Sequence, residues 1–331
     1  MVRAIFLLIL GLAIAIGCET GINASQSSFT VRLPIDCDLG ENCFVLLYPD
    51  RDPSPNAVDV GCGRMTYDGH QGTDFAIPDE QVMAAGVPVK AVAEGTVLRI
   101  RDGIPDRRIE TPAQETEVSD IECGNGMVVD HADGWETQYC HLRQGSVEVK
   151  AGDRVTPDTT LGMVGQSGLA SFPHVHLTVR HQGDVVDPFV GPNAGDGCNV
   201  SKQPLWQEPL PYVPTGLVRA GFAPRPPELD ELWEGEFADS TLAASSSALI
   251  FWAQVYGVLA GDVESIQLID SDGTAIANQQ TPLQDSNRIW FSYAGKQSPD
   301  SGFQPGTWQG RYQLTRGDRT LVDIQKELRV E

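Results

Sequence analysis

Hydrophobic and polar residues alternate in short runs along most of this chain, which is the pattern of β-strands. Alternating runs occupy 87–100, 124–130 and 137–142, and glycine-rich turns separate them. The last two flank a turn at 131–134, so they predict a β-hairpin with Tyr139 and His141 on one face of its second strand and Cys140 on the other. Helical periodicity is almost absent, and the sequence therefore predicts a mainly β fold built from antiparallel sheets.

A proline-rich segment divides the chain near its middle. It contains Pro204, Pro209, Pro211, Pro214, Pro224 and Pro226. Beyond it, about seven short strands fit an immunoglobulin-like β-sandwich. We expect a first domain at 29–200, a linker at 201–227 and the sandwich domain at 228–331. The sandwich sequence contains no histidine or cysteine and offers no obvious chemistry.

The first 17 residues carry Arg3 and then an apolar run. This run is short for a membrane span of about 20 residues and is typical of a secretory signal peptide. Residues 18–28 are small and polar, as in a tether. Residues 15–18 resemble a bacterial lipobox with Ala15 in place of the usual leucine. We expect an exported protein, either lipid-anchored at Cys18 or released into the periplasm or medium after signal cleavage.

Cysteine usage agrees with export. Six cysteines remain when Cys18 is set aside, and all precede residue 200. An even number in an exported chain predicts up to three disulfides confined to the first domain, with fifteen connectivities left open. No CxxC spacing supports a cysteine-based zinc site.

The chain is strongly acidic, with a formal net charge of −22. Such an acidic chain should avoid nucleic acid and anionic lipid surfaces. Because no basic patch interleaved with aromatic residues is present, we expect no nucleic-acid binding.

The candidate chemistry lies in four of the six histidines and one aspartate. His174 and His176 are two apart in an expected strand and therefore project to one face, which suits one metal ligand beside one catalytic imidazole. His70 and Asp74 are four apart. The glycines around them disfavour a helix, but an extended segment also returns both side chains to one face. Three nitrogen and oxygen ligands with an open position are the composition of a catalytic zinc centre.

The remaining histidines have simpler interpretations. His131 belongs to the hairpin turn and His181 follows a strand, so we expect both to be structural or exposed to solvent. Tyr67 and Tyr139 are candidates to line a cleft, although packing is the commoner role of strand tyrosines. The long polar insertion at 102–122 is expected to border a substrate groove.

The order of these motifs resembles the lysostaphin/LytM family of zinc metallopeptidases, which cut peptide bonds in bacterial peptidoglycan. The resemblance runs from about Tyr67 to Pro188. It rests on the segments His70-Gln71-Gly72-Thr73-Asp74-Phe75, Val89-Lys90-Ala91, Gly95-Thr96-Val97, Gly124-Asn125-Gly126, Thr137-Gln138-Tyr139-Cys140-His141-Leu142, Gly152-Asp153-Arg154-Val155 and Pro173-His174-Val175-His176.

The resemblance implies one zinc ion per chain. It implies that His70, Asp74 and His176 bind the metal and that His141 and His174 are the catalytic imidazoles, with the choice of general base left open. The family commonly continues the HxH motif with an aromatic residue and a glutamate. Here Leu177 and Thr178 follow instead, and Thr178 is expected to alter the support of a ligand.

The sequence therefore predicts an exported zinc metalloendopeptidase that acts on stem or cross-link peptides of peptidoglycan and loses activity at acid pH. The alternative is a non-catalytic module that binds peptidoglycan or activates a separate hydrolase. The sandwich domain is a candidate to bind wall polymer, to position the catalytic domain or to contact a partner.

Overall fold

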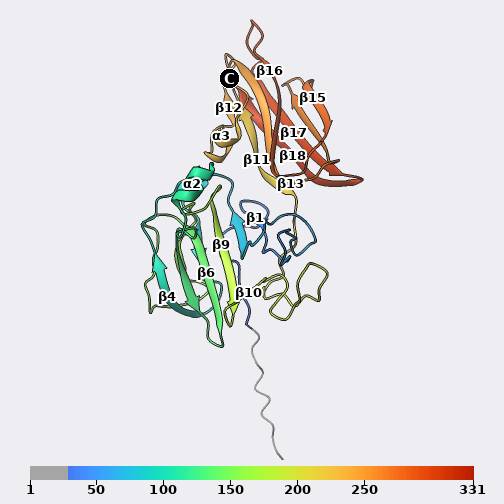
Figure 1. Ribbon diagram of the computed structural model, residues 1–331. Coiled ribbons are helices and arrows are strands. Elements are labelled where there is room, and N and C mark those ends of the chain that lie inside the picture. Colours follow the sequence, from blue (N-terminus) through green and yellow to red (C-terminus); the bar gives the residue numbers. More distant parts are fainter. Residues whose placement is uncertain (1–28) are drawn as a thin grey trace, which may run out of the picture.

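The computed structural model describes residues 29–331 and is mainly β. The expected signal peptide, the tether and Cys18 lie outside the described residues. Figure 1 shows two β-rich parts joined end to end, one containing β1 to β10 and the other β11 to β18. None of the helices at 29–331 is long and apolar enough to cross a membrane.

The first part is organised around an eight-stranded antiparallel sheet with the order β1-β2-β9-β6-β5-β4-β7 and β10 on the edge of β9. Its strands are β1 (Phe44–Leu47), β2 (Thr73–Ala76), β4 (Gly95–Arg101), β5 (Asn125–Asp130), β6 (Trp135–Leu142), β7 (Arg154–Val155), β9 (His174–His181) and β10 (Asp184–Val186). A separate pair is formed by β3 (Pro88–Lys90) and β8 (Thr160–Met163). Two short helices, α1 (Glu80–Ala85) and α2 (Pro112–Glu117), complete this part.

The alternation in β9 decides which face of the sheet carries the polar side chains. Val175, Leu177 and Val179 are buried in the hydrophobic core. The intervening positions, which include His174 and His176, therefore project to the opposite face. The expected orientation of these two histidines is confirmed.

The hairpin of β5 and β6 is confirmed, but the expected face of His141 is wrong. Tyr139 is fully buried in the core, and its hydroxyl oxygen accepts a hydrogen bond of 2.8 Å from the Val92 backbone N–H. His141 has a φ of +64°, and its own N–H donates to the Cys123 carbonyl oxygen. This left-handed backbone breaks the alternation of the strand and turns His141 to the side of His174.

Three disulfides lie in the first part, as the cysteine count predicted. They join Cys37 to Cys43, Cys62 to Cys198 and Cys123 to Cys140. The last bridge connects the start of β5 to β6 beside His141.

The second part consists of two sheets that share one core. The three-stranded sheet contains β11 (Gly216–Ala223), β13 (Ala248–Val258) and β16 (Asn287–Gln297). The five-stranded sheet has the order β12 (Thr241–Leu242), β18 (Arg319–Val330), β17 (Gly306–Arg316), β14 (Val263–Ile269) and β15 (Ala275–Pro282). Side chains from both sheets, such as Phe251 and Tyr312, form the core between them. A short helix, α3 (Leu229–Trp233), precedes β12.

The proline-rich segment is more ordered than a linker. Residues 216–223 form β11, which pairs along β13 and so belongs to the second part. Trp206, earlier in the segment, is buried against the first part, where it contacts Phe75 and Phe189. The domain limits and the immunoglobulin-like topology stay predictions.

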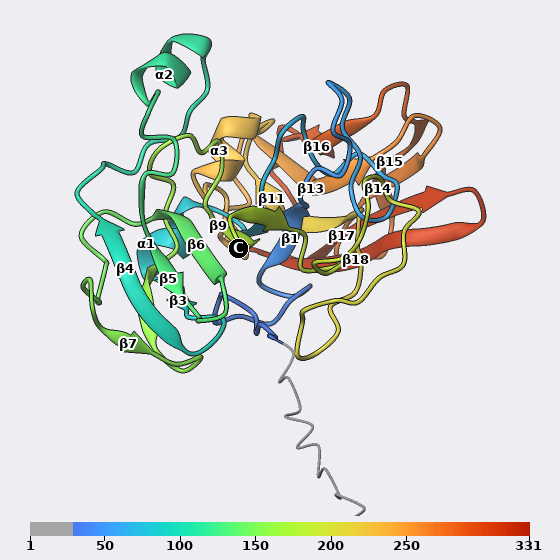
Figure 2. The same cartoon turned by 60° about the horizontal axis from the view of Figure 1, so that its bottom comes forward.

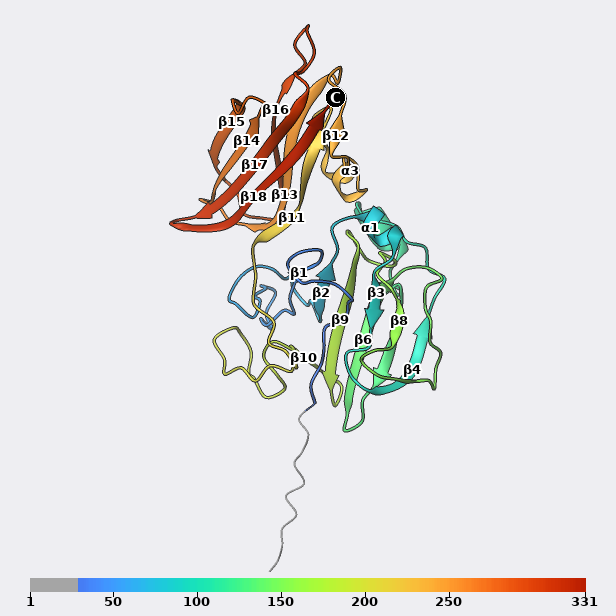
Figure 3. The ribbon, with the colours of Figure 1, turned by 180° about the vertical axis from the view of Figure 1, so that it is seen from behind.

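The two parts are in direct contact. Phe44 of β1 stacks on Tyr256 of β13 with ring centroids 5.0 Å apart. Arg219 of β11 forms an ion pair of 2.7 Å with the Asp79 carboxylate, which also caps α1. Figures 2 and 3 show α3 at the junction between the large sheet and the sandwich.

Candidate metal centre and active site

Three potential ligands from separate segments meet on the polar face of the large sheet. His70 lies in the loop before β2, Asp74 in β2 and His176 in β9. Strand pairing aligns Asp74 directly with His176. His70 Nε2 lies 3.2 Å from both Asp74 Oδ1 and His176 Nδ1, and the last two atoms are 2.8 Å apart.

These separations suit a small divalent cation. Tetrahedral zinc with bonds of 2.0–2.1 Å holds neighbouring ligand atoms about 3.3 Å apart. Two imidazoles and one carboxylate are also the ligand types that catalytic zinc sites use.

Hydrogen bonds on the far sides of the rings explain why these three groups need a cation. His70 Nδ1 donates to the Tyr48 carbonyl oxygen at 2.7 Å, which leaves a lone pair on Nε2. A proton on His176 Nε2 is satisfied by Thr178 Oγ1 at 3.0 Å, which leaves a lone pair on Nδ1. Two lone pairs and a carboxylate then face one another at about 3 Å, and only a cation or a shared proton relieves their repulsion.

Two further imidazoles border this group. His174 Nδ1 donates to the Phe172 carbonyl oxygen and His141 Nδ1 donates to the Ser167 carbonyl oxygen, each at 2.8 Å. Their rings are 4.6 Å apart, and His174 Nε2 lies 3.7 Å from Asp74 Oδ1. In both rings the Nε2 atom is therefore free to accept a proton next to the three ligands.

The site is largely closed to water, and this sets its protonation. Burial lowers the pKa of His174, and it lowers the pKa of His141 well below the ordinary value with help from the His174 and His176 imidazoles. Burial alone would raise the pKa of Asp74, but the facing His70 imidazole and a hydrogen bond from His176 hold it well below its usual range. The site thus contains an ionised carboxylate beside two neutral imidazoles, as metal binding and proton acceptance both require.

Glycine at position 72 allows the close approach of the loop to β9. A Cβ atom on Gly72 would lie 2.4 Å from His176 Nε2 and 2.6 Å from the Leu177 carbonyl oxygen. Any side chain here would displace the His176 ring or the strand. Gly72, one of the glycines that argued against a helix in this motif, therefore has a packing role.

A cleft of about 520 Å³ opens on these residues, which is within the usual range for ligand pockets. Its floor includes Asp74, His141, His174 and His176, and the 102–122 insertion contributes Arg108, Ile109 and Glu110 to one wall. The insertion therefore borders the cleft, as expected. Tyr67 also lines it and is 45% exposed, whereas Tyr139 is packing.

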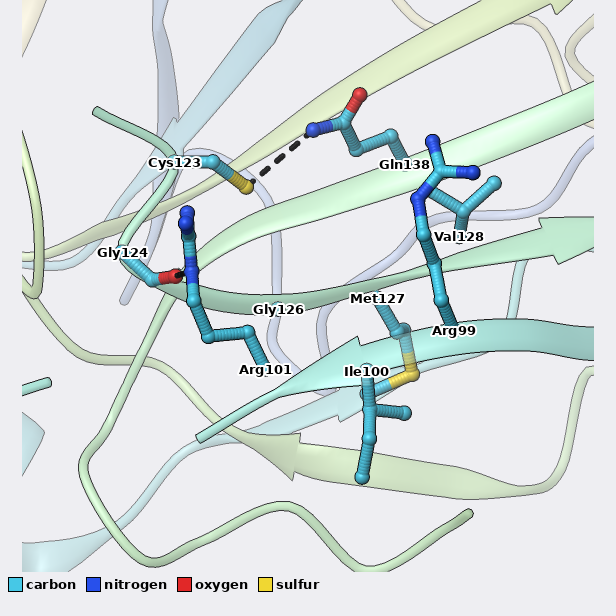
Figure 4. A pocket seen from close by; sticks show the side chains of 9 residues that line it. All are labelled: Arg99, Ile100, Arg101, Cys123, Gly124, Gly126, Met127, Val128 and Gln138. Atoms are coloured by element: carbon cyan, nitrogen blue, oxygen red, sulfur yellow. Dashed lines mark hydrogen bonds between the residues drawn. The ribbon is translucent and has the colours of Figure 1, made fainter. Parts of the chain in front are cut away.

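A shallower depression continues from the metal group along the exposed face of the sheet. Gln138 and Cys123 connect the region around His176 to the ends of β4 and β5. Figure 4 shows Arg99 extending toward Gln138 and Arg101 toward Gly124, whose carbonyl oxygen accepts a hydrogen bond from Arg101 Nε.

The structure brings together all five residues that the sequence singled out. His131 instead contacts the Glu94 carbonyl oxygen and Thr137, and His181 stacks on Trp135, so both lie outside the group. Sequence reasoning missed the contribution of the second part. Trp233 and Arg288 line the cleft from α3 and β16, and nothing in their local sequence signals this role.

Comparisons with known proteins match the part of the chain that contains these residues. Residues 68–188 match the model of Peptidase family M23. DD-carboxypeptidase/endopeptidase Mpg of Neisseria meningitidis is 31% identical over 120 residues, which are 36% of this chain and 22% of that protein. Peptidoglycan DD-endopeptidase ShyA of Vibrio cholerae is 28% identical over 118 residues, again 36% of this chain and 22% of the relative.

Among solved structures, the catalytic domain of lysostaphin from Staphylococcus simulans is 23% identical. It aligns with a TM-score of 0.28 and covers 42% of this chain and 85% of its own. The chain spans about a quarter or less of the length of the curated relatives it matches. Residues 68–188, which include all five site residues, are a Peptidase M23 domain.

Proposed function

We propose that this chain is an exported zinc metalloendopeptidase that hydrolyses peptide bonds in stem or cross-link peptides of peptidoglycan. In this proposal His70, Asp74 and His176 hold one zinc ion, and His141 and His174 are the catalytic imidazoles. The observation that carries it is the convergence of two imidazole nitrogens and one carboxylate oxygen within about 3 Å, beside two imidazoles whose Nδ1 atoms are held by carbonyl oxygens.

When bound, zinc supplies Lewis acidity toward the scissile carbonyl and a water of lowered pKa. The histidines of the chain carry out the proton transfers. The Nε2 atom of His174 or His141 accepts the proton from the attacking water, and the imidazolium that forms can then donate to the developing oxyanion or to the leaving amine. Because their Nδ1 atoms are held by carbonyl oxygens, both rings keep this orientation throughout.

The pH dependence follows from the same residues. Burial lowers the pKa of both imidazoles, so their neutral, proton-accepting forms persist below the ordinary histidine value of about 6.5. Activity should fall at more acid pH, where protons also compete with the metal for His70 and His176. Full activity well below pH ~5 would contradict this assignment.

Peptidoglycan is the proposed substrate because several relatives of residues 68–188 are named as peptidoglycan DD-endopeptidases. The three disulfides of the first part support an oxidising compartment outside the cytoplasm, either periplasmic, lipid-anchored through Cys18, or secreted. We place the catalytic domain at 29–200 and the sandwich domain at 228–331, with β11 joining the sandwich from the 201–227 segment.

The test is digestion of purified peptidoglycan sacculi with and without a metal chelator. Mass spectrometry should find new peptide ends that disappear with chelator and return when zinc is added back. A protein that binds sacculi and releases no fragments would instead favour a binding or hydrolase-activating module.

A further inference from the structure

One wall of the active-site cleft comes from the second part of the chain. Leu229, Asp230 and Trp233 of α3 and Arg288 and Ile289 of β16 line the same cleft as the metal group. Trp233 stacks on Phe172, which in turn stacks on His174 with ring centroids 4.4 Å apart. A peptide lying across the catalytic imidazoles would therefore also touch the sandwich domain.

Arg288 is held in this wall by backbone contacts. Its Nε donates to the Arg64 carbonyl oxygen at 3.4 Å, and its Nη2 donates to the Thr66 carbonyl oxygen. Tyr67 directly follows Thr66, and its ring contacts the tilted ring of His70 with centroids 4.6 Å apart. The Arg288 guanidinium is thus fixed close to a proposed metal ligand, with Nη1 engaged by neither carbonyl.

Arg64, whose carbonyl oxygen accepts the hydrogen bond from Arg288 Nε, contributes a second positive charge nearby. Arg64 Nη1 is buried and has no hydrogen-bond partner within 29–331. The pKa of Arg288 is lowered, first by burial and then by the nearby positive charge of Arg64. Among the described residues, no carboxylate comes within 4.0 Å of either guanidinium.

Another arginine that lines the cleft gives a contrast. Arg108 lies within 4.0 Å of four carboxylates, those of Glu80, Glu110, Asp230 and Glu234. The chain has 45 acidic and 23 basic residues, so acidic partners are abundant. Arg288 lines the cleft without such a partner, and Arg64 lies behind it without lining the cleft. An arginine in this position fits an anionic group that comes from outside the chain.

We propose that Arg288 forms a carboxylate-binding subsite, through which the sandwich domain selects peptides that carry a free carboxylate near the cleaved bond. This inference rests on the proposed peptidase function. A planar guanidinium can bind a carboxylate through two parallel hydrogen bonds, whereas an uncharged carboxamide cannot match both. We expect a preference of about 10- to 100-fold for the carboxylate form.

The experiment uses two synthetic peptides that differ only in a carboxylate or a carboxamide on the residue next to the cleaved bond. Binding is measured by calorimetry on the full zinc-loaded chain carrying His174→Ala, which separates recognition from turnover. The carboxylate peptide should bind about 10- to 100-fold more tightly. Adding Arg288→Gln should remove this difference, and Arg288→Lys should keep part of it.

Arg319→Gln is the matched control, because Arg319 is an exposed arginine on β18 and does not line the cleft. It should leave the preference intact. Equal binding of the two peptides, or a preference that survives Arg288→Gln, would overturn the subsite.

With the unsubstituted chain, the same preference should appear in kcat/KM, mainly through KM. Absence of chelator-sensitive cleavage of both peptides, together with a retained binding preference, would refute the proposed function and leave the subsite standing. Cleavage of both peptides without a binding preference would refute the subsite and leave the proposed function standing.

Discussion

Replacing Thr178 by valine tests how the chain supports its proposed metal ligand. The Thr178 hydroxyl lies 3.0 Å from His176 Nε2, and Thr178 is buried. Valine has nearly the same shape but cannot accept the ring proton. His176 would then lose the contact that keeps the lone pair on Nδ1, the atom that faces Asp74.

Loss of such an outer contact typically costs 10- to 100-fold in metal affinity, or about 1.4 to 2.7 kcal/mol. We expect Thr178→Val to weaken zinc binding by this amount while the protein still folds. Competition with a fluorescent zinc chelator near neutral pH measures the affinity, and thermal unfolding of the metal-free protein checks the fold.

Thr73→Val is the matched control. Thr73 is equally buried and adjacent to Asp74, but its hydroxyl has no hydrogen-bond partner within 29–331. Removing an unsatisfied buried hydroxyl is neutral or stabilising, and zinc affinity should not change. The reasoning is refuted if Thr178→Val binds zinc as tightly as the unsubstituted chain, or if both variants weaken binding equally.

Three further predictions follow from other parts of the first domain. Gly72→Ala should yield protein without zinc, because its Cβ would lie 2.4 Å from His176 Nε2; a full zinc content by elemental analysis would contradict this. Burial raises the pKa of Asp187 to about 6, so the folded chain holds a proton that the unfolded chain releases, and this carboxyl destabilises the fold as the pH rises from about 4 to 6. Asp187→Asn should remove up to about 3 kcal/mol of that loss in urea unfolding, and an unchanged pH profile would exclude the assignment. Replacing Cys123 and Cys140 together by serine should lower the free energy of unfolding by about 3 kcal/mol, and an unchanged thermal midpoint would show that the bridge is not needed for stability.

Strand periodicity predicted the parts of the fold that depend on local sequence. Alternation in β9 placed Val175 and Leu177 in the core and the two histidines on the other face. The turn residues at 131–134 predicted the hairpin. In these segments burial on one face fixes the register, so the pattern is visible along the chain.

The same alternation failed at His141, where a positive φ reverses the side chain. That conformation depends on the hydrogen bond from the His141 N–H to the Cys123 carbonyl oxygen, and thus on the path of a segment 18 residues earlier. Periodicity contains no information about such a contact. The family resemblance nevertheless indicated His141, because it rests on the order of the motifs and not on which face of the strand each side chain occupies.

The contribution of the sandwich domain could not be predicted from local pattern. Arg288 is one residue of a strand, and its side chain is held in the cleft wall by hydrogen bonds to carbonyl groups more than 200 positions earlier in the chain. The proline-rich segment was also a poor guide to the boundary, because Ala220 and Phe222 within it pair with β13. Both features arise from packing between the two parts.

The central claim is that ligation and proton transfer are divided between two sets of residues. The most direct test is the zinc content and the sacculus-cleaving activity of His174→Ala and His70→Ala, measured side by side. We predict that His174→Ala retains about one zinc ion per chain and releases no peptides. His70→Ala should lose both zinc and activity. Loss of zinc from His174→Ala, or cleavage by either variant, would contradict the account.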